Sequence, residues 1–272
     1  NDSGLHRKSG TVNVVPYAGD NPLYKKGHLK VSDNRRYLTY ANGEPFFWLG
    51  DTLWGAFIAA KQDEWQMFLQ NRKDNKFNIL QVHCGGAWKW IGNLKADRDG
   101  NAPFRGEGKS LQWNPLYWQQ VDRKVQAANE AGLMVYICAV RQPGPGFPED
   151  DDEQVAIFAR NLAARMMGSF VVYSPIADDV WSQQADVAGE MLNRYRGIHL
   201  ISTHPRFFLE PSIVAHGKEY IDVVGTQPGC GWTFDPYKKE KNTGFSQPLV
   251  AQNAIQWPLT LYQLTPVKPV ID

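Results

Sequence analysis

Polar and aromatic side chains follow several short apolar segments of the chain, and their chemical types suit the recognition of a sugar. The set consists of Asp51, Trp54, His83, Asp178, His204 and Gln227. Carboxylate, imidazole and amide groups bind hydroxyl groups, while an indole ring stacks on the apolar face of a sugar ring. The pattern therefore predicts a carbohydrate site in which Asp178 is catalytic and the other five side chains bind substrate.

Asp178 is the residue that we expect to transfer a proton. Cleavage of a glycosidic bond needs two carboxyl groups, one of which acts as a proton donor in the first step. The apolar residues 170–173 precede Asp178, so its carboxyl group would lie at a partly desolvated mouth, which favours a donor. An equally favoured alternative is that Asp178 caps a helix starting near Val180, since aspartate is among the best N-cap residues. Asp179 fits that capping role at least as well.

The other candidates have structural alternatives too. Asp51 could cap a helix near Thr52, and a lone histidine at a strand end, such as His83 or His204, is more often a structural hydrogen-bond partner. These three side chains could also converge in space as metal ligands. The chain has no HExxH motif, however, and its three cysteines lie far apart without a CxxC pair. We therefore predict no metal and no cofactor.

The elements that would position these side chains alternate between strands and helices. Buried-strand patterns occupy residues 46–49, 78–83, 133–140, 170–176, 199–203, 222–227 and 269–271, and helical patterns occupy residues 63–75, 116–130, 153–167 and 180–195. Such alternation is typical of a parallel sheet with crossover helices. Before it, residues 28–32 and 36–40 alternate apolar with polar, which predicts a small antiparallel β cap. Residues 1–27 show little periodicity and are expected to form an arm.

Seven strands favour one fold class over the alternatives. No GxGxxG or Walker motif follows the first strand, so a nucleotide-binding doubly wound sheet is disfavoured. We predict a TIM (β/α)8 barrel over residues 28–272 that stops after its seventh strand. Active sites of this fold lie at the carboxyl ends of the strands, where the candidate residues occur. An open barrel exposes two strand edges, so we expect a C-terminal segment or a partner chain to complete it.

The amino-acid composition disfavours two classes of binding partner. A net charge of +1 provides no basic field for nucleic acid, and no run of about 18 apolar residues could span a bilayer. Neither nucleic acid nor membrane is therefore predicted as a partner. The 10 Trp, 11 Tyr and 13 Phe suit stacking against sugar rings, and they suit a large core equally well.

Several segments resemble one known family, the apiosidase-like glycoside hydrolases of glycoside hydrolase family 140 and its relatives. The resemblance is carried by residues 29–32, 36–38, 43–54, 76–81, 117–118, 121–122, 203–205, 226–229 and 266–272. It is strongest in the first quarter of the chain, where Gly43 to Trp54 reads GEPFFWLGDTLW, and looser thereafter.

The resemblance implies a retaining TIM-barrel enzyme that acts on plant pectic or related polysaccharides. It places an aspartate acid/base after strand four, at Asp178, where the family's Gly-Gly-Asp reads Ile-Ala-Asp in this chain. It places a glutamate nucleophile after strand seven, directly beyond Asp272, and it implies an extracellular, cell-surface or periplasmic location. The alternative is a catalytically degenerate carbohydrate-binding or structural module of a larger surface or virus-particle assembly, which the two replaced glycines favour.

Overall fold

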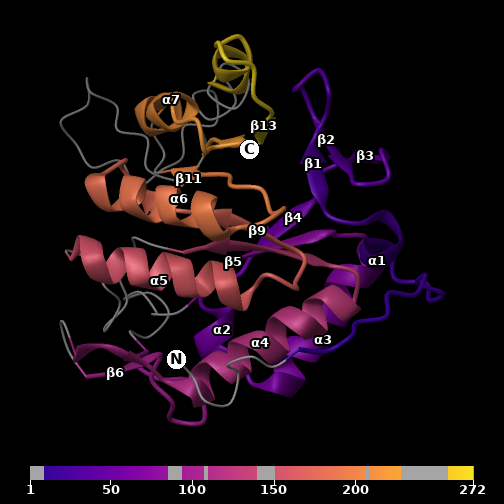
Figure 1. Cartoon of the computed structure of the whole chain (residues 1–272), viewed down its shortest axis with the longest axis vertical. Helices are drawn as coiled ribbons and strands as arrows, with labels where there is room; N and C mark the ends of the chain where they lie inside the picture. Colours follow the sequence, from indigo (N-terminus) through magenta and orange to yellow (C-terminus); the bar gives the residue numbers. More distant parts are fainter. Residues whose placement is uncertain are drawn as a thin grey trace, which may run out of the picture.

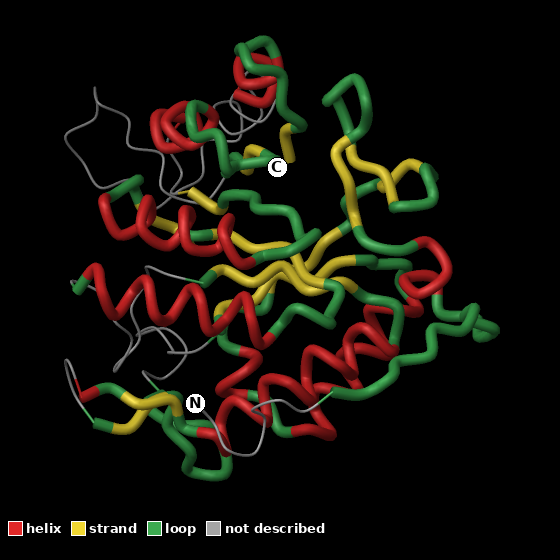
Figure 2. The backbone as a smooth tube through the Cα atoms, viewed as in Figure 1, coloured by secondary structure: helices red, strands yellow, loops and turns green. Residues whose placement is uncertain are grey.

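A computed structural model of the chain describes residues 9–84, 94–106, 110–139, 151–205, 209–227 and 257–271. Figures 1 and 2 show these residues as a parallel sheet wrapped by helices on its outer side, with a small separate antiparallel sheet near the start of the chain.

The centre of the fold is a four-stranded parallel sheet. It contains β4 (Gly50–Thr52), β5 (Ile79–His83), β8 (Met134–Cys138) and β9 (Val171–Ser174), in the order β4-β5-β8-β9. Consecutive strands of the chain are therefore neighbours in space, as expected for parallel strands joined by right-handed crossovers. The ladder aligns Thr52 with Gln81, and Gln81 with Tyr136, so polar and aromatic side chains of three strands come to one level.

Three further chain segments continue this sheet in sequence order. Ile201 forms a parallel bridge to Tyr173, and β10 (Ala177–Asp179) pairs in parallel with β11 (His204–Pro205). The carbonyl oxygen of Ile201 then accepts hydrogen bonds from the backbone N–H groups of Asp222 (2.8 Å) and Val223 (3.3 Å). Finally β12 (Val224–Gly225) pairs in parallel with β13 (Val270–Ile271). The predicted parallel α/β fold is confirmed, but within the described residues β4 and β13 are not paired, so the sheet does not close.

Apolar side chains alternate between the two faces of the sheet. Leu80, Val82, Val135 and Ile137 belong to an outer layer, whereas Ile79, Met134, Tyr136, Cys138 and Val172 belong to an inner one. Because successive residues of a strand point to opposite faces, a sheet buried on both faces needs continuous apolar strands. The sequence of β8, MVYIC, has this property, whereas β5 departs from it at Gln81 and His83.

Helices bury the outer layer. They are α3 (Gln62–Asp74), α4 (Pro115–Glu130), α5 (Asp152–Arg165), α6 (Gln183–Tyr195) and α7 (Leu209–His216), with the short helices α1 (Pro22–Lys26) and α2 (Ala56–Ala59). A short hairpin of β6 (Phe104–Arg105) and β7 (Gln112–Trp113) precedes α4. The side chains of Asn114, Asp151 and Ser182 accept hydrogen bonds from the first turns of α4, α5 and α6, so each of these helices begins at a favourable N-cap.

An antiparallel sheet stands beside the open edge of the parallel one. It contains β1 (Leu29–Val31), β2 (Leu38–Tyr40) and β3 (Pro45–Phe46). The turn between β1 and β2 reaches the end of the described chain, since Arg35 Nε donates to the carbonyl oxygen of Val267 (2.8 Å). The guanidinium of Arg36 lies 4.2 Å from the ring centre of Tyr262. Together, these contacts join the first and last elements across the gap between β4 and β13.

The strand expected at residues 46–49 lies elsewhere. Phe46 belongs to β3 of the antiparallel sheet, and the first parallel strand begins only at Gly50. The connecting backbone is held by a side chain, because Asn78 Nδ2 donates to Phe47 O (2.6 Å) and Asn78 Oδ1 accepts from Leu49 N (3.0 Å). The apolar run 46–49 therefore starts in the antiparallel sheet and leads into the parallel sheet. The hydrophobic pattern alone does not show this boundary.

Gly225 allows the closest backbone approach in the sheet. A Cβ atom added there would lie 1.8 Å from the carbonyl oxygen of Thr203, so no other residue fits. The Thr203 hydroxyl accepts a hydrogen bond from Gly225 N (2.9 Å), and Ser212 Oγ donates to Gly225 O (3.0 Å). This contact packs the segment after Ile201 directly against β12.

We predict that His28 makes the fold sensitive to acid. Its ring stacks on Phe170 at 4.4 Å and meets His199 edge-on at 5.0 Å, and burial together with the charge of His199 lowers the pKa of His28 from 6.5 to about 4. Between these pH values the unfolded chain binds a proton at His28 that the folded chain does not, so stability falls as pH drops through this window.

Denaturant unfolding of the wild type and His28→Phe between pH 7 and pH 4 measures this contribution. Phenylalanine keeps the stacking but cannot titrate, so the variant should lose less stability on acidification. Equal losses in the two proteins would contradict the prediction.

Candidate active site

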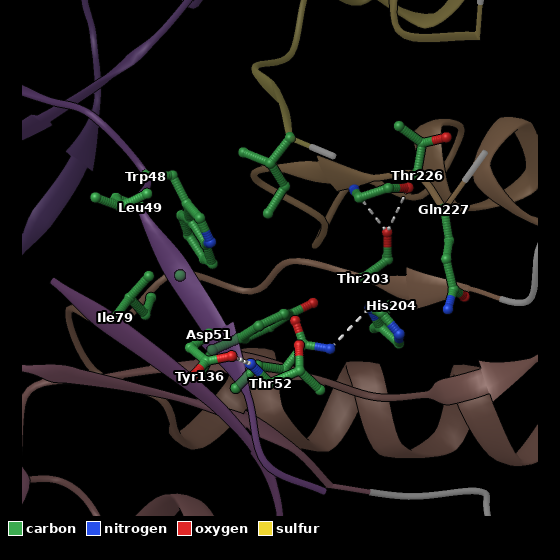
Figure 3. A pocket seen from close by; sticks show the side chains of 14 residues that line it. Trp48, Leu49, Asp51, Thr52, Ile79, Tyr136, Thr203, His204, Thr226 and Gln227 are labelled. Atoms are coloured by element: carbon green, nitrogen blue, oxygen red, sulfur yellow. Dashed lines mark hydrogen bonds between the residues drawn. The ribbon is translucent and has the colours of Figure 1, made fainter. Parts of the chain in front are cut away.

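A cavity of about 420 Å³ opens between β4 on one side and β12 and β13 on the other. Its wall includes Trp48, Asp51, Thr52, Gln81, Tyr136, Thr203, His204, Thr226, Gln227 and Ile271. Figure 3 shows Asp51 and Thr52 on the β4 side and His204, Thr226 and Gln227 across from them. The cavity thus lies where several strands end, with polar groups on opposite walls.

A chain of three polar side chains crosses the sheet at this level. Gln81 Nε2 lies 3.0 Å from His204 Nδ1, and His204 Nε2 lies 3.0 Å from Asp178 Oδ1. Gln81 and His204 line the cavity, and Asp178 stands beside them with 16% of its side chain exposed. The structure therefore brings together two of the predicted residues, Asp178 and His204, through the imidazole ring.

Asp178 has a backbone conformation that non-glycine residues rarely adopt. Its φ angle is +50°, in the left-handed region, which short polar side chains such as aspartate tolerate better than others. Such conformations cost free energy and concentrate at functional sites. The helix-capping alternative is wrong, because α6 begins at Gln183 and its N-cap is Ser182, whose hydroxyl accepts from Ala185 N (3.3 Å). Asp178 is therefore outside the helix and its capping turn.

Ser174 fixes Asp178 and His204 relative to each other. Its buried hydroxyl accepts hydrogen bonds from Ile176 N (3.3 Å) and His204 N (3.0 Å) and donates to Ile176 O (2.5 Å). One side chain thereby joins the end of β9, the segment leading to Asp178, and the start of β11. Sequence analysis did not identify Ser174.

Asp51 lines the cavity but has a cationic partner. Its carboxylate pairs with Arg72 of α3, and its Oδ1 accepts from Thr52 N (2.8 Å). The alternative of a helix cap is wrong here too, because α2 begins at Ala56 and Gly55 precedes it without a side-chain cap. The ion pair holds the Asp51 carboxylate against the cavity wall, where one face remains partly exposed.

Trp54 is half-buried beside His204 and is not part of the cavity wall. The ring of Trp54 meets the His204 ring edge-on, with centres 4.8 Å apart, and the Trp54 carbonyl oxygen accepts from His83 N (3.2 Å). His83 is buried and does not line the cavity. The residue of β5 that reaches His204 is Gln81, two positions earlier and on the same face of the strand. The period of two in a strand is the signal that could have identified it.

The opposite wall includes the polar side chains of Thr226 and Gln227. Thr226 is 5% exposed, and among the described residues neither its Oγ1 nor Gln227 Oε1 has a hydrogen-bond partner. Both oxygen atoms are buried within the wall, where polar atoms are nearly always hydrogen-bonded. Burial also raises the pKa of Tyr136 well above its usual value, so its phenol stays neutral.

Among the described residues, no three histidine, cysteine or carboxylate side chains cluster in a way that could hold a metal ion. No described helix is both long enough and apolar enough to cross a bilayer.

Solved structures with a similar fold come from glycoside hydrolases. A glycoside hydrolase family 5 protein from Bacteroides vulgatus ATCC 8482 matches with a TM-score of 0.72 and 22% identity, covering 92% of this chain and 53% of that one. A second glycoside hydrolase matches with a TM-score of 0.71 and 19% identity over 92% of this chain and 56% of that one. A family 5 mannosidase from Rhizomucor miehei gives a TM-score of 0.58 and 13% identity, covering 90% and 72%.

The parallel sheet, its helices and the site at its strand ends thus define a glycoside hydrolase-like α/β fold. The model of the apiosidase-like catalytic domain matches residues 32–272, and the chain belongs to this family. No curated protein sequence matches it significantly. The chain spans about half the length of the first two structures that it resembles.

We predict that removing the Ser174 hydroxyl destabilises the site. Ser174→Ala leaves the N–H groups of Ile176 and His204 without their acceptor, which should lower the free energy of unfolding by roughly 2–3 kcal/mol. Ser212→Ala is the matched control. In this variant Gly225 O keeps the Thr203 hydroxyl as a second donor (3.5 Å), so the free energy of unfolding should fall less. Urea unfolding of both variants measures the difference, and equal losses would contradict the assigned role.

Proposed function

We propose that the chain is the catalytic part of a glycoside hydrolase that cleaves a polysaccharide or oligosaccharide, with Asp178 as the acid/base. The observation that carries the proposal is the left-handed Asp178, hydrogen-bonded to His204 beside a polar cavity at the strand ends. Membership of the apiosidase-like catalytic family supports it.

In the proposed mechanism Asp178 gives its proton to the glycosidic oxygen as the bond to the anomeric carbon breaks. A second carboxylate is needed about 5–5.5 Å away to form the covalent intermediate of a retaining reaction. Ile271 of β13 lines the cavity, and catalytic groups of this fold come from the carboxyl ends of its strands. We assign the nucleophile to the segment directly after β13, which lies outside the described residues.

Four side chains are proposed to hold the sugar. Thr226 and Gln227 are polar side chains of one wall, and Asp51 offers a carboxylate on the other. Trp54 presents an aromatic surface next to His204, where a sugar ring bound near the acid could stack. His83 is proposed to support Trp54 through its backbone rather than to touch substrate.

The cavity is open on the side between β4 and β13, and another strand, from a later segment of the protein or from a partner chain, is proposed to close that side beside the bound sugar. Phe47 and Leu49, which precede β4, are 77% and 36% exposed, and a second cavity of about 250 Å³ lies between Phe47 and Val270. Uncovered strand edges beside apolar side chains promote association.

The protein restricted to residues 1–272 should therefore self-associate. Size-exclusion chromatography with light scattering measures this, and Phe47→Lys should reduce the association because it places a charge at the apolar rim. A wild-type monomer with one cooperative melting transition would contradict the proposed strand.

The catalytic assignment predicts the behaviour of Asp178→Asn. Asparagine tolerates the left-handed backbone and can still accept from His204, but it cannot donate an acidic proton. Release of reducing sugar should fall by about 10²–10⁴-fold, while glycan binding persists. The assay is a reducing-sugar measurement on pectic and other plant polysaccharides, with binding followed by calorimetry.

The adjacent Asp179→Asn is the matched control. Asp179 Oδ1 accepts from Val180 N (2.7 Å) in the strand-to-helix connection, so this variant should keep most of its activity. A wild-type protein that binds glycans without cleaving any of them would instead indicate a carbohydrate-binding module.

A further inference from the structure

We propose that Gln81 is a positioning residue that sets the tautomer of His204 and thereby decides which oxygen of Asp178 carries the catalytic proton. This inference rests on the proposed function of Asp178. It begins with the order of hydrogen bonds that runs from Gln81 of β5 through His204 of β11 to Asp178 of β10. Figure 3 shows His204, the middle member, in the cavity wall.

The side-chain nitrogen of Gln81 is a donor and never an acceptor. Placed 3.0 Å from His204 Nδ1, it requires a lone pair on that ring nitrogen. A neutral imidazole with unprotonated Nδ1 carries its proton on Nε2. His204 Nε2 therefore donates to Asp178 Oδ1, 3.0 Å away. The hydrogen bonds have one direction, from amide to imidazole to carboxyl.

Neighbouring backbone and side-chain groups fix the positions of Gln81 and His204, and with them this order of hydrogen bonds. Gln81 is paired to β4 and β8 in the parallel ladder, and its carbonyl oxygen accepts from Leu53 N (2.8 Å). The backbone of His204 is held by the Ser174 hydroxyl, and the Trp54 ring borders the imidazole. The side chains of His204 and Asp178 are 15% and 16% exposed, so water has limited access to either.

The direction of these bonds has a chemical consequence. Since Asp178 Oδ1 already accepts a hydrogen bond from His204, the acidic proton of Asp178 belongs on Oδ2. In the first step Oδ2 transfers this proton to the glycosidic oxygen, the bond from that oxygen to the anomeric carbon breaks, and an alcohol leaves while the nucleophilic carboxylate of the proposed function bonds to the anomeric carbon. Asp178 becomes a carboxylate that keeps the His204 hydrogen bond. In the second step Oδ2 takes a proton from a water molecule, whose oxygen bonds to the anomeric carbon as the bond to the nucleophile breaks.

Gln81→Glu tests the assignment with almost no change in shape. A carboxylate at this position accepts instead of donating, so Nδ1 acquires a proton. Nε2 then either lacks a proton and accepts a hydrogen bond from Asp178, which moves the acidic proton to Oδ1, or belongs to an imidazolium ion that holds Asp178 as a carboxylate. In both cases Asp178 loses its function as an acid. Gln66→Glu, on the exposed face of α3, controls for the added negative charge.

Two measurements are made on the protein. Nitrogen-15 NMR of the histidine rings should show His204 in the wild type with Nδ1 bare and Nε2 protonated, and should show Nδ1 protonated in Gln81→Glu. Kinetics with glycosides of poor leaving groups should show kcat/KM reduced by about 10²-fold in Gln81→Glu with little change in KM. Activated aryl glycosides need no acid in that step, so their kcat/KM should fall much less.

The outcomes separate this inference from the proposed function. A wild-type His204 protonated on Nδ1 and bare on Nε2 overturns the inference, as does an equal loss of kcat/KM on activated and unactivated substrates. A wild-type protein that has the expected tautomer but cleaves no glycoside overturns the proposed function, and with it the catalytic role of the hydrogen bonds from Gln81 through His204 to Asp178. The order of these hydrogen bonds would still be supported.

Discussion

The burial of both faces of one parallel sheet is the constraint on which the rest of this structure depends. Inner and outer side chains alternate along β5, β8 and β9, and each face is covered by apolar groups. Asp178 and His204 lie on the short paired strands β10 and β11, whereas Gln81 lies at the centre of β5, where its side chain lines the cavity. The hydrogen bonds of the three side chains therefore join the centre of β5 to β11 and β10 across the inner side of the sheet.

The apolar runs and helix caps of the sequence predict most of this scaffold. The alternation of strands and helices indicates a parallel α/β fold, because each covered strand needs a continuous apolar run. The pattern failed where one run served two sheets, at residues 46–49, since hydrophobicity does not report which neighbour a backbone bonds to. It also placed the start of α6 too early, near Val180, because Asp179 and Ser182 are both good capping residues and only geometry selects Ser182.

The candidate site was predicted less completely than the fold. Asp178 and His204 were identified as polar residues after apolar strands, and the structure joins them by a hydrogen bond. The sequence predicted His83 rather than Gln81 as the site residue of β5, because histidine is the more common catalytic residue type. Ser174 and the left-handed backbone of Asp178 have no signature in residue type alone. They arise from contacts between segments that are about 30 residues apart in the chain.

The contacts of Arg35 and Arg36 with residues near the end of the described chain affect the order of folding. Arg35 and Val267 are 232 positions apart, and Arg36 and Tyr262 are 226 apart. The entropy lost on closing a loop grows with its length, at roughly 0.6 kcal/mol for each doubling. Exposed contacts of this kind do not compensate for that loss until the sheet between them has formed. The turn between β1 and β2 therefore docks on Tyr262 and Val267 late in folding, and on partial unfolding these contacts should separate before the strands at the centre of the parallel sheet.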